Sequence, residues 1–194
     1  MSVGGAALTF VSVFVAALLA FYLDGLRERR ATQRWVKEYL GFWRGMLGSN
    51  PEERAVNEAH LDRIDAALAD WLDPGRSPRQ PRWADIDTIN VNNAIAFTPL
   101  LLSSGVSVVP ADLLQRLFLA DATAPALKGS SEWVTRLFET QIRPLVWARV
   151  DGLDDVQRHA VETYRAEFAQ FSELTRQYQG MLSSIHDELA TAGF

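Results

Sequence analysis

The chain has 194 residues, of which 48% are hydrophobic and 22% charged, and its 24 acidic and 19 basic side chains give a net charge of −5. Its length suits one domain, alone or with an appendage, and this hydrophobic fraction excludes a disordered chain. The absence of cysteine excludes disulfides, thiolate metal sites and a cysteine nucleophile, and the acidic balance argues against a nucleic-acid partner.

The first segment, residues 3–23 (VGGAALTFVSVFVAALLAFYL), contains no charged residue in 21 positions. As a helix it would be about 31 Å long, which matches the hydrocarbon thickness of a bilayer. A cleaved signal peptide and a buried core helix are the alternatives. No basic side chain precedes the segment, and no small-x-small cleavage site follows Leu18. We therefore expect residues 1–23 to form a single transmembrane anchor.

The basic collar, residues 24–47, predicts the orientation of this anchor. It holds six basic and three acidic side chains, a net charge of +3, whereas residues 48–194 hold thirteen basic and twenty-one acidic ones, a net charge of −8. The positive-inside rule then places the body in the cytoplasm and the N-terminus outside. Tyr22, Arg27, Arg29 and Arg30 are the expected contacts with the lipid bilayer at its interface.

One stripe of small residues runs along the apolar segment. Its members are Gly5, Thr9, Ser12, Ala16 and Ala20, spaced by three or four residues. Such a stripe lets another transmembrane helix approach closely, so other integral membrane proteins are expected partners and a homo-oligomer is possible. The competing explanation is that small residues are simply common in membrane helices.

Residues 24–47 read as an amphipathic juxtamembrane helix without proline. Trp35, Tyr39 and Trp43 are four residues apart and therefore share one face. Trp35 would lie about 18 Å beyond Leu23 in a straight helix, too far to anchor in the headgroups. This aromatic face must pack on the body or on a partner, and we favour the body.

The body, residues 48–194, opens with a helix from Pro51, which Asn50 and Glu53 would cap. Residues 61–72 carry the apolar positions of this helix, and Asp73-Pro74-Gly75 ends it. Residues 73–82 (DPGRSPRQPR) form a basic, proline-rich loop. This loop could touch lipid phosphate, although a solvated loop is the favoured interpretation.

The middle of the body gives weaker signals. A helical turn is expected at residues 83–89, and a helix at residues 92–103 with a kink or a second start at Pro99. The next helix begins at residues 110–112, with Leu113, Leu114, Leu117 and Phe118 facing inward. A spacer is expected at residues 121–130, followed by a helix over residues 131–152 that is bent or broken near Pro144.

The last segment shows the clearest periodicity, with steps alternating between three and four residues. It comprises Val161, Tyr164, Phe168, Phe171, Thr175, Tyr178, Leu182, Ile185 and Leu189. This is a heptad seam, and its aromatic character favours packing in a globular bundle over a two-stranded zipper. Since no β-type alternation of useful length occurs, the predicted fold is all-α: one transmembrane helix that continues into a cytoplasmic helical bundle with a long C-terminal helix.

The sequence contains none of the common catalytic motifs. None of the three histidines belongs to an H-E-x-x-H motif, and the sequence contains no nucleophile elbow, phosphate-binding loop or dinucleotide fingerprint. His159 and Glu162 have the spacing of a di-iron pair, but Glu167 faces away from the seam, so chance explains the pair better. We expect no enzyme activity, no metal and no cofactor.

The order of these features resembles a group of uncharacterised bacterial single-pass membrane proteins. The matching stretches are FVAALLAFYLDGLRERR, then Glu38-Tyr39-Leu40, then NNAIAFTPLLLSSGVSVVPADLLQRLF. The tryptophans of residues 35–43 and the loop at residues 73–82 depart from that pattern. The resemblance implies a place in the bacterial inner membrane.

Two functional hypotheses follow from the sequence. The first is a non-enzymatic accessory subunit that packs against and stabilises a larger membrane complex, whether photosynthetic, respiratory or secretory. The alternative is a membrane-tethered adaptor for signalling or stress responses. In both, Trp35, Tyr39 and Trp43 would pack on the body or a partner, as would the seam residues from Tyr164 to Ile185.

Overall fold

The computed structural model of the chain describes residues 3–47, 51–73, 75, 81, 97–148, 150 and 152–194, with the backbone alone for residues 3–17 and 51–53. Several expectations fall outside this part of the chain. These are the cap at Asn50, most of the loop at residues 73–82, the helical turn at 83–89 and the helix start at residues 92–93. Of the small-residue stripe, only the side chain of Ala20 is described.

The described residues form helices and turns and contain no strand, which confirms the all-α prediction. The long helices are α1 (Val3–Leu47), α2 (Pro51–Leu72), α5 (Ala111–Leu137) and α7 (Asp155–Thr191). Four short elements accompany them: α4 (Thr98–Leu101), the 3₁₀ helix η1 (Ser104–Val108), the π-helix η2 (Phe138–Ile142) and α6 (Arg143–Trp147).

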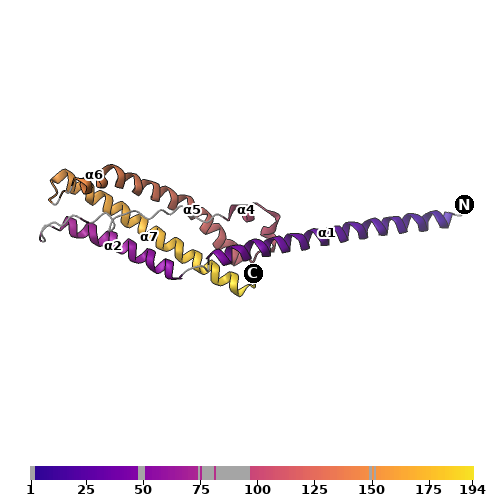
Figure 1. Cartoon of the computed structure of the whole chain (residues 1–194). Helices are drawn as coiled ribbons and strands as arrows, with labels where there is room; N and C mark the ends of the chain where they lie inside the picture. Colours follow the sequence, from indigo (N-terminus) through magenta and orange to yellow (C-terminus); the bar gives the residue numbers. More distant parts are fainter. Residues whose placement is uncertain are drawn as a thin grey trace.

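Helix α7 is the centre of the bundle. It lies between α5 and α2 and contacts both, and its C-terminal end contacts α1 (Figure 1). Helix α1 joins the bundle only with its C-terminal part and projects away from it, so the N-terminus lies far from the other elements (Figure 1). The molecule is therefore a bundle with one long, projecting helix.

The sequence explains why α7 is long and well defined. Asp154 and Gln157 form a capping box, in which each side chain accepts a hydrogen bond from the other residue's backbone N–H, at 2.8 Å and 3.1 Å. The predicted seam is buried along the helix, except that Leu182 is partly buried and packs against the core. The heptad prediction is confirmed.

Helix α5 corrects the prediction of a spacer at residues 121–130, because one helix runs through it without interruption. Ala120, Ala124 and Leu127 are buried there and continue the seam of Leu113 and Leu117. Alanines at a seam give little hydrophobic signal, yet they leave room for the large side chains of a neighbouring helix such as α7.

Three further corrections concern this helical region. Phe118, expected to face inward, is half exposed at 50%. The second helix does not start at residue 131 but is the end of α5, and α6 stops at Trp147 rather than near Gly152.

The bend expected near Pro144 is the π-helix η2, where the backbone N–H of Arg143 donates a hydrogen bond to the carbonyl of Phe138. Proline has no N–H and its ring clashes with the carbonyl four residues earlier, so the wider π register accommodates it.

Helix α2 has the predicted bounds within the described residues, and Leu61, Ile64, Leu68 and Trp71 are buried against the core. Its C-terminus is tied to α7, because the Arg158 guanidinium donates to the carbonyl of Leu72 at 2.8 Å.

Helix α1 is one continuous helix of 45 residues and joins the predicted segments 1–23 and 24–47 without a break. Val36 and Leu40 are buried in the bundle. Over the described residues, no helix is both long enough and apolar enough to cross a membrane.

Candidate functional site

The aromatic face of α1 packs on the body. Trp35 stacks on Tyr39 with ring centroids 5.4 Å apart, Tyr39 meets the edge of Trp43 at 6.2 Å, and Trp43 meets Phe97 at 5.7 Å. Phe97 is fully buried at the start of α4, so the row of rings continues from α1 into the core. Aromatic pairs in this geometry stabilise by about 0.5–1.5 kcal/mol each beyond their burial.

Gly105 lets η1 approach α1 closely. A Cβ atom at this position would lie 2.6 Å from Cγ2 of Val36 and 2.9 Å from Cζ3 of Trp35, far inside van der Waals contact. Gly105 is buried, and only a glycine leaves space for these two side chains. The junction of α1 with the bundle therefore depends on a residue without a side chain.

Asp121 fixes α4 to α5. One carboxylate oxygen accepts hydrogen bonds from the backbone N–H groups of Phe97 at 2.6 Å and Thr98 at 2.9 Å, and both oxygens accept from the Thr98 hydroxyl. A carboxylate at the start of a helix satisfies donors that have no partner in the helix itself. This contact places Phe97 where it meets Trp43.

A second contact ties the end of α1 to the end of α7. The Arg44 guanidinium donates to the main-chain oxygen of Phe194 at 2.7 Å. Helix α1 is thus held by η1, by Phe97 and by the C-terminal end of α7.

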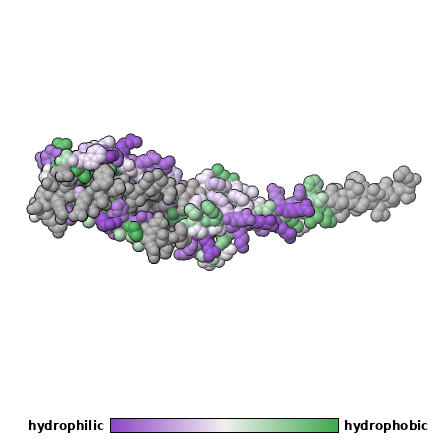
Figure 2. Space-filling view, in the orientation of Figure 1, coloured by the Kyte–Doolittle hydropathy of each residue, from purple (hydrophilic) through white to green (hydrophobic). Residues whose placement is uncertain are grey.

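The projecting part of α1 carries two zones. Leu18, Leu19, Phe21, Tyr22 and Leu23 are exposed over 49–77% of their surface. Figure 2 shows this apolar zone in green, followed toward the bundle by the hydrophilic zone of the basic collar. An exposed apolar zone of this kind is typical of surfaces that contact lipid or protein.

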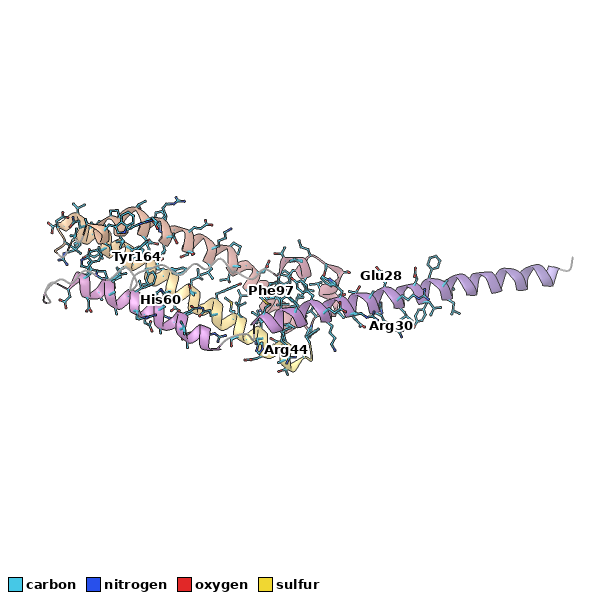
Figure 3. The ribbon with its side chains drawn as sticks, in the orientation of Figure 1. Glu28, Arg30, Arg44, His60, Phe97 and Tyr164 are labelled. Atoms are coloured by element: carbon cyan, nitrogen blue, oxygen red, sulfur yellow. The ribbon has the colours of Figure 1, made fainter. Side chains whose placement is uncertain are left out.

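The collar residues lie between the apolar zone and the bundle. Arg27, Arg29 and Arg30 are all exposed, and Figure 3 shows Glu28 and Arg30 on the projecting part of α1, with Arg44 and Phe97 at its junction with the bundle. The predicted interface residues are therefore adjacent to one another along α1 and free to meet solvent, lipid or a partner.

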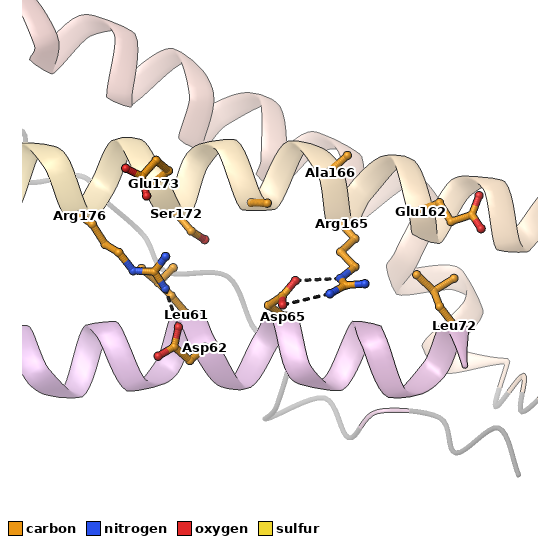
Figure 4. A pocket seen from close by; sticks show the side chains of 11 residues that line it. Leu61, Asp62, Asp65, Leu72, Glu162, Arg165, Ala166, Ser172, Glu173 and Arg176 are labelled. Atoms are coloured by element: carbon orange, nitrogen blue, oxygen red, sulfur yellow. Dashed lines mark hydrogen bonds and ion pairs between the residues drawn. The ribbon is translucent and has the colours of Figure 1, made fainter. Parts of the chain in front are cut away.

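A groove of about 570 Å³ lies between α2 and α7. Figure 4 shows two aspartates of α2 facing two arginines of α7. Arg165 binds both oxygens of Asp65, at 2.8 Å and 3.2 Å, and Arg176 binds Asp62 at 2.5 Å. The hydrogen bond from Arg165 is the main cause that holds the pKa of Asp65 below its ordinary value of 3.8, and the same bond raises the pKa of Arg165.

These charged pairs hold helices together. Each of these two carboxylates forms an ion pair with a guanidinium of the facing helix, so the pairs join α2 to α7. Over the described residues, no three histidine, aspartate or glutamate side chains gather closely enough to hold a metal ion. His159 and Glu162 have the spacing of a di-iron pair in the sequence. In the structure His159 is exposed, and Glu162 lines this groove.

The structure separates the two aromatic sets that the sequence singled out. The first set, Trp35 to Trp43, lies where α1 enters the bundle. The second set begins at Tyr164, near the other end of the bundle (Figure 3), and Phe138, Tyr164, Phe168 and Phe171 form a row with ring centroids 6.0–6.1 Å apart. Tyr178 and Ile185 are buried farther along α7.

Sequence reasoning missed three residues that build the junction. In the sequence, Gly105 looks like an ordinary residue at the end of a helix, and Asp121 lies in the expected spacer at residues 121–130. Phe194, the partner of Arg44, is 150 residues away from it in the sequence. Only the run Ser103-Ser104-Gly105 before a valine-rich stretch hinted at a special backbone there.

Neither the family models, the curated proteins nor the solved structures contain a match to this chain.

Proposed function

We propose that this chain is a non-enzymatic, membrane-anchored accessory subunit. The apolar segment of α1 would span the bacterial inner membrane, with the N-terminus outside and the bundle on the cytoplasmic face. There the bundle would pack against and stabilise a larger membrane complex.

The observation that carries this proposal is the continuity of α1. One helix contains the uncharged residues 3–23, the basic collar and the buried residues Val36 and Leu40. Because a helix transmits position and rotation along its axis, the bundle would be held at a fixed height and angle relative to the anchor. A flexible linker would be expected if the anchor served only as a tether.

The exposed apolar zone supports the same proposal. Leaving a Leu or Phe side chain in water forgoes about 1.5–3 kcal/mol relative to full burial. Leu18, Leu19, Phe21 and Leu23 are all largely exposed in the isolated chain, at fractions of 49–77%. A bilayer would cover them without any change in the bundle.

Membrane extraction tests the anchor. Wild-type protein should stay in the membrane fraction at alkaline pH, whereas Val13→Arg should release much of it, because a central arginine costs about 2.5–3.5 kcal/mol of insertion free energy. Ala31→Arg adds the same charge in the exposed collar and should leave extraction unchanged. Release of the wild-type chain by alkali would contradict the anchor.

Purification in mild detergent, followed by mass spectrometry of co-purifying chains, tests the role as a subunit. A stoichiometric integral membrane partner is the expected result. A clean monomer would contradict this role, and a partner bound only under stress or stimulation would favour the alternative of a membrane-tethered adaptor.

A further inference from the structure

A second groove, of about 520 Å³, lies between α1 and η1, next to the exposed apolar zone. One wall of the groove is a single face of helix α1, on which the lining residues follow one another at intervals of three and one positions. These residues are Gly25, Glu28, Arg29, Thr32 and Gln33. Along the helix axis this face begins about 3 Å beyond Leu23 and ends about 15 Å beyond it. For a chain anchored as proposed, this interval includes the headgroup layer, which is about 5–8 Å thick in each leaflet.

The η1 wall contributes Ser104, Ser107 and Val108. Its shape is fixed by local hydrogen bonds: the Ser103 hydroxyl donates to the carbonyl of Leu100 at 2.7 Å and accepts from the N–H of Gly105 at 3.1 Å. The groove is therefore formed in advance by two segments about 75 residues apart in the sequence, rather than by one exposed helix face.

The charges of this groove are one carboxylate and one guanidinium. Glu28 and Arg29 are both exposed, and neither forms an ion pair with another residue that the structure describes. The hydroxyls of Thr32 and Ser104 and the amide of Gln33 add hydrogen-bond donors. This set complements a ligand that carries a phosphate for the guanidinium and an ammonium for the carboxylate.

We propose that the α1–η1 groove binds the phosphoethanolamine headgroup of a membrane phospholipid, an inference that rests on the proposed membrane anchor. Arg29, Thr32 and Ser104 donate hydrogen bonds to the phosphate, and Glu28 accepts them from the ammonium. An anionic headgroup without an amine would leave the carboxylate facing a like charge, and a choline headgroup has no N–H to donate to it.

Leu102 favours a lipid over a soluble phosphate ester. It lies two residues before Ser104 and is 84% exposed, more than any other large apolar side chain among the described residues. An apolar side chain this exposed is more stable against an apolar neighbour, such as a lipid chain, than in water. Figure 1 shows α4 and the segment that follows it at the end of the bundle from which α1 projects.

Native mass spectrometry of the full chain tests the headgroup assignment. The chain is equilibrated in micelles with equimolar phosphatidylethanolamine, phosphatidylcholine and phosphatidylglycerol of identical acyl chains. Wild-type protein should retain the ethanolamine lipid several-fold over the other two. Arg29→Gln should lower its retention about tenfold, as expected for the loss of a charge-assisted hydrogen bond, and Glu28→Gln should abolish the preference over phosphatidylglycerol.

Matched controls lie on the same helix. Arg34→Gln and Glu38→Gln make the same charge changes at exposed positions outside the groove and should leave the lipid preference unchanged. Equal retention of the three lipids by the wild-type chain would overturn the assignment. Equal losses for Arg29→Gln and Arg34→Gln would also overturn it, because they would show general attraction to the collar.

Two further results separate this inference from the proposed function. A chain that resists alkaline extraction yet shows no lipid preference would overturn the groove assignment and leave the anchor standing. A chain released by alkali would overturn the anchor and the lipid assignment together. Displacement of the lipid by an equal concentration of glycerophosphoethanolamine would show that the groove recognises a soluble headgroup, and the lipid assignment would be wrong.

Discussion

The substitution Gly105→Ala tests how α1 joins the bundle. The added Cβ would lie 2.6 Å from Cγ2 of Val36, 2.9 Å from Cζ3 of Trp35 and 3.0 Å from Oγ of Ser103. Carbon atoms in contact are about 3.5–4.0 Å apart, so η1 must move away from α1 by roughly 1 Å. Because Val36 is only 1% exposed, its side chain has little free space into which to move.

The expected cost combines two opposing effects. Overpacking of a filled contact costs about 1–3 kcal/mol. Replacement of glycine by alanine also lowers the entropy of the unfolded chain, which stabilises the protein by about 0.4–1 kcal/mol. The net destabilisation is about 1–2 kcal/mol, which for a chain of this size lowers Tm by roughly 2–8 °C.

Thermal unfolding in detergent, together with hydrogen exchange of residues 97–109, measures this effect. Gly41→Ala is the matched control, since a Cβ atom at Gly41 meets nothing within 4 Å and the residue lies inside α1. That variant should raise stability by about 0.5–1 kcal/mol through helix propensity. The close approach of η1 to α1 would be refuted if Gly105→Ala matched or exceeded the wild-type stability while Gly41→Ala behaved as expected.

Substitutions at three aspartates test the contacts that hold the bundle. Asp121→Ala leaves two backbone N–H groups at the start of α4 without their acceptor and should cost about 1–3 kcal/mol in chemical denaturation; Asp121→Asn retains an acceptor oxygen and should cost less, and equal costs would contradict this role. Arg165 lowers the pKa of Asp65 in the folded chain. The stability that this pair contributes is therefore fully present above the pKa of the unfolded chain, and it is lost as the pH falls through the pKa of the folded chain. Asp65→Asn should therefore destabilise by about 0.2–1 kcal/mol at pH 7, where the exposed pair is partly screened, and by progressively less as the pH falls below 3.8; a constant difference would refute the pairing. Asp154→Ala removes the cap of α7 and should lower stability by about 0.5–2 kcal/mol, with faster hydrogen exchange confined to the first turn; unchanged exchange there would count against the capping box.

Periodicity predicted the helices whose buried faces carry large apolar side chains. The seam of α7 and the face of α2 were predicted almost residue by residue, because each repeats large side chains at steps of three and four. The same reasoning failed in α5. Ala120 and Ala124 are buried with side chains too small to register as a hydrophobic stripe, and Pro125 lies inside the helix, where proline is disfavoured. Packing against α7 overrides those local preferences.

The junction of α1 was predicted in part. The spacing of Trp35, Tyr39 and Trp43 correctly identified one packing face on α1. Its contact surface on the body was beyond sequence reasoning, because Gly105 and Asp121 act through backbone proximity and long-range hydrogen bonds. Such contacts leave no periodic pattern in a single sequence.

Cysteine labelling tests the central claim most directly, because the natural chain contains no cysteine and each introduced one reports alone. The variants Ser2→Cys and Thr191→Cys are treated with a membrane-impermeant maleimide in intact spheroplasts of a bacterial host. An anchored chain with its bundle inside predicts labelling of Ser2→Cys at once and of Thr191→Cys only after permeabilisation. Labelling of Thr191→Cys in intact spheroplasts, or protection of both positions, would contradict the account.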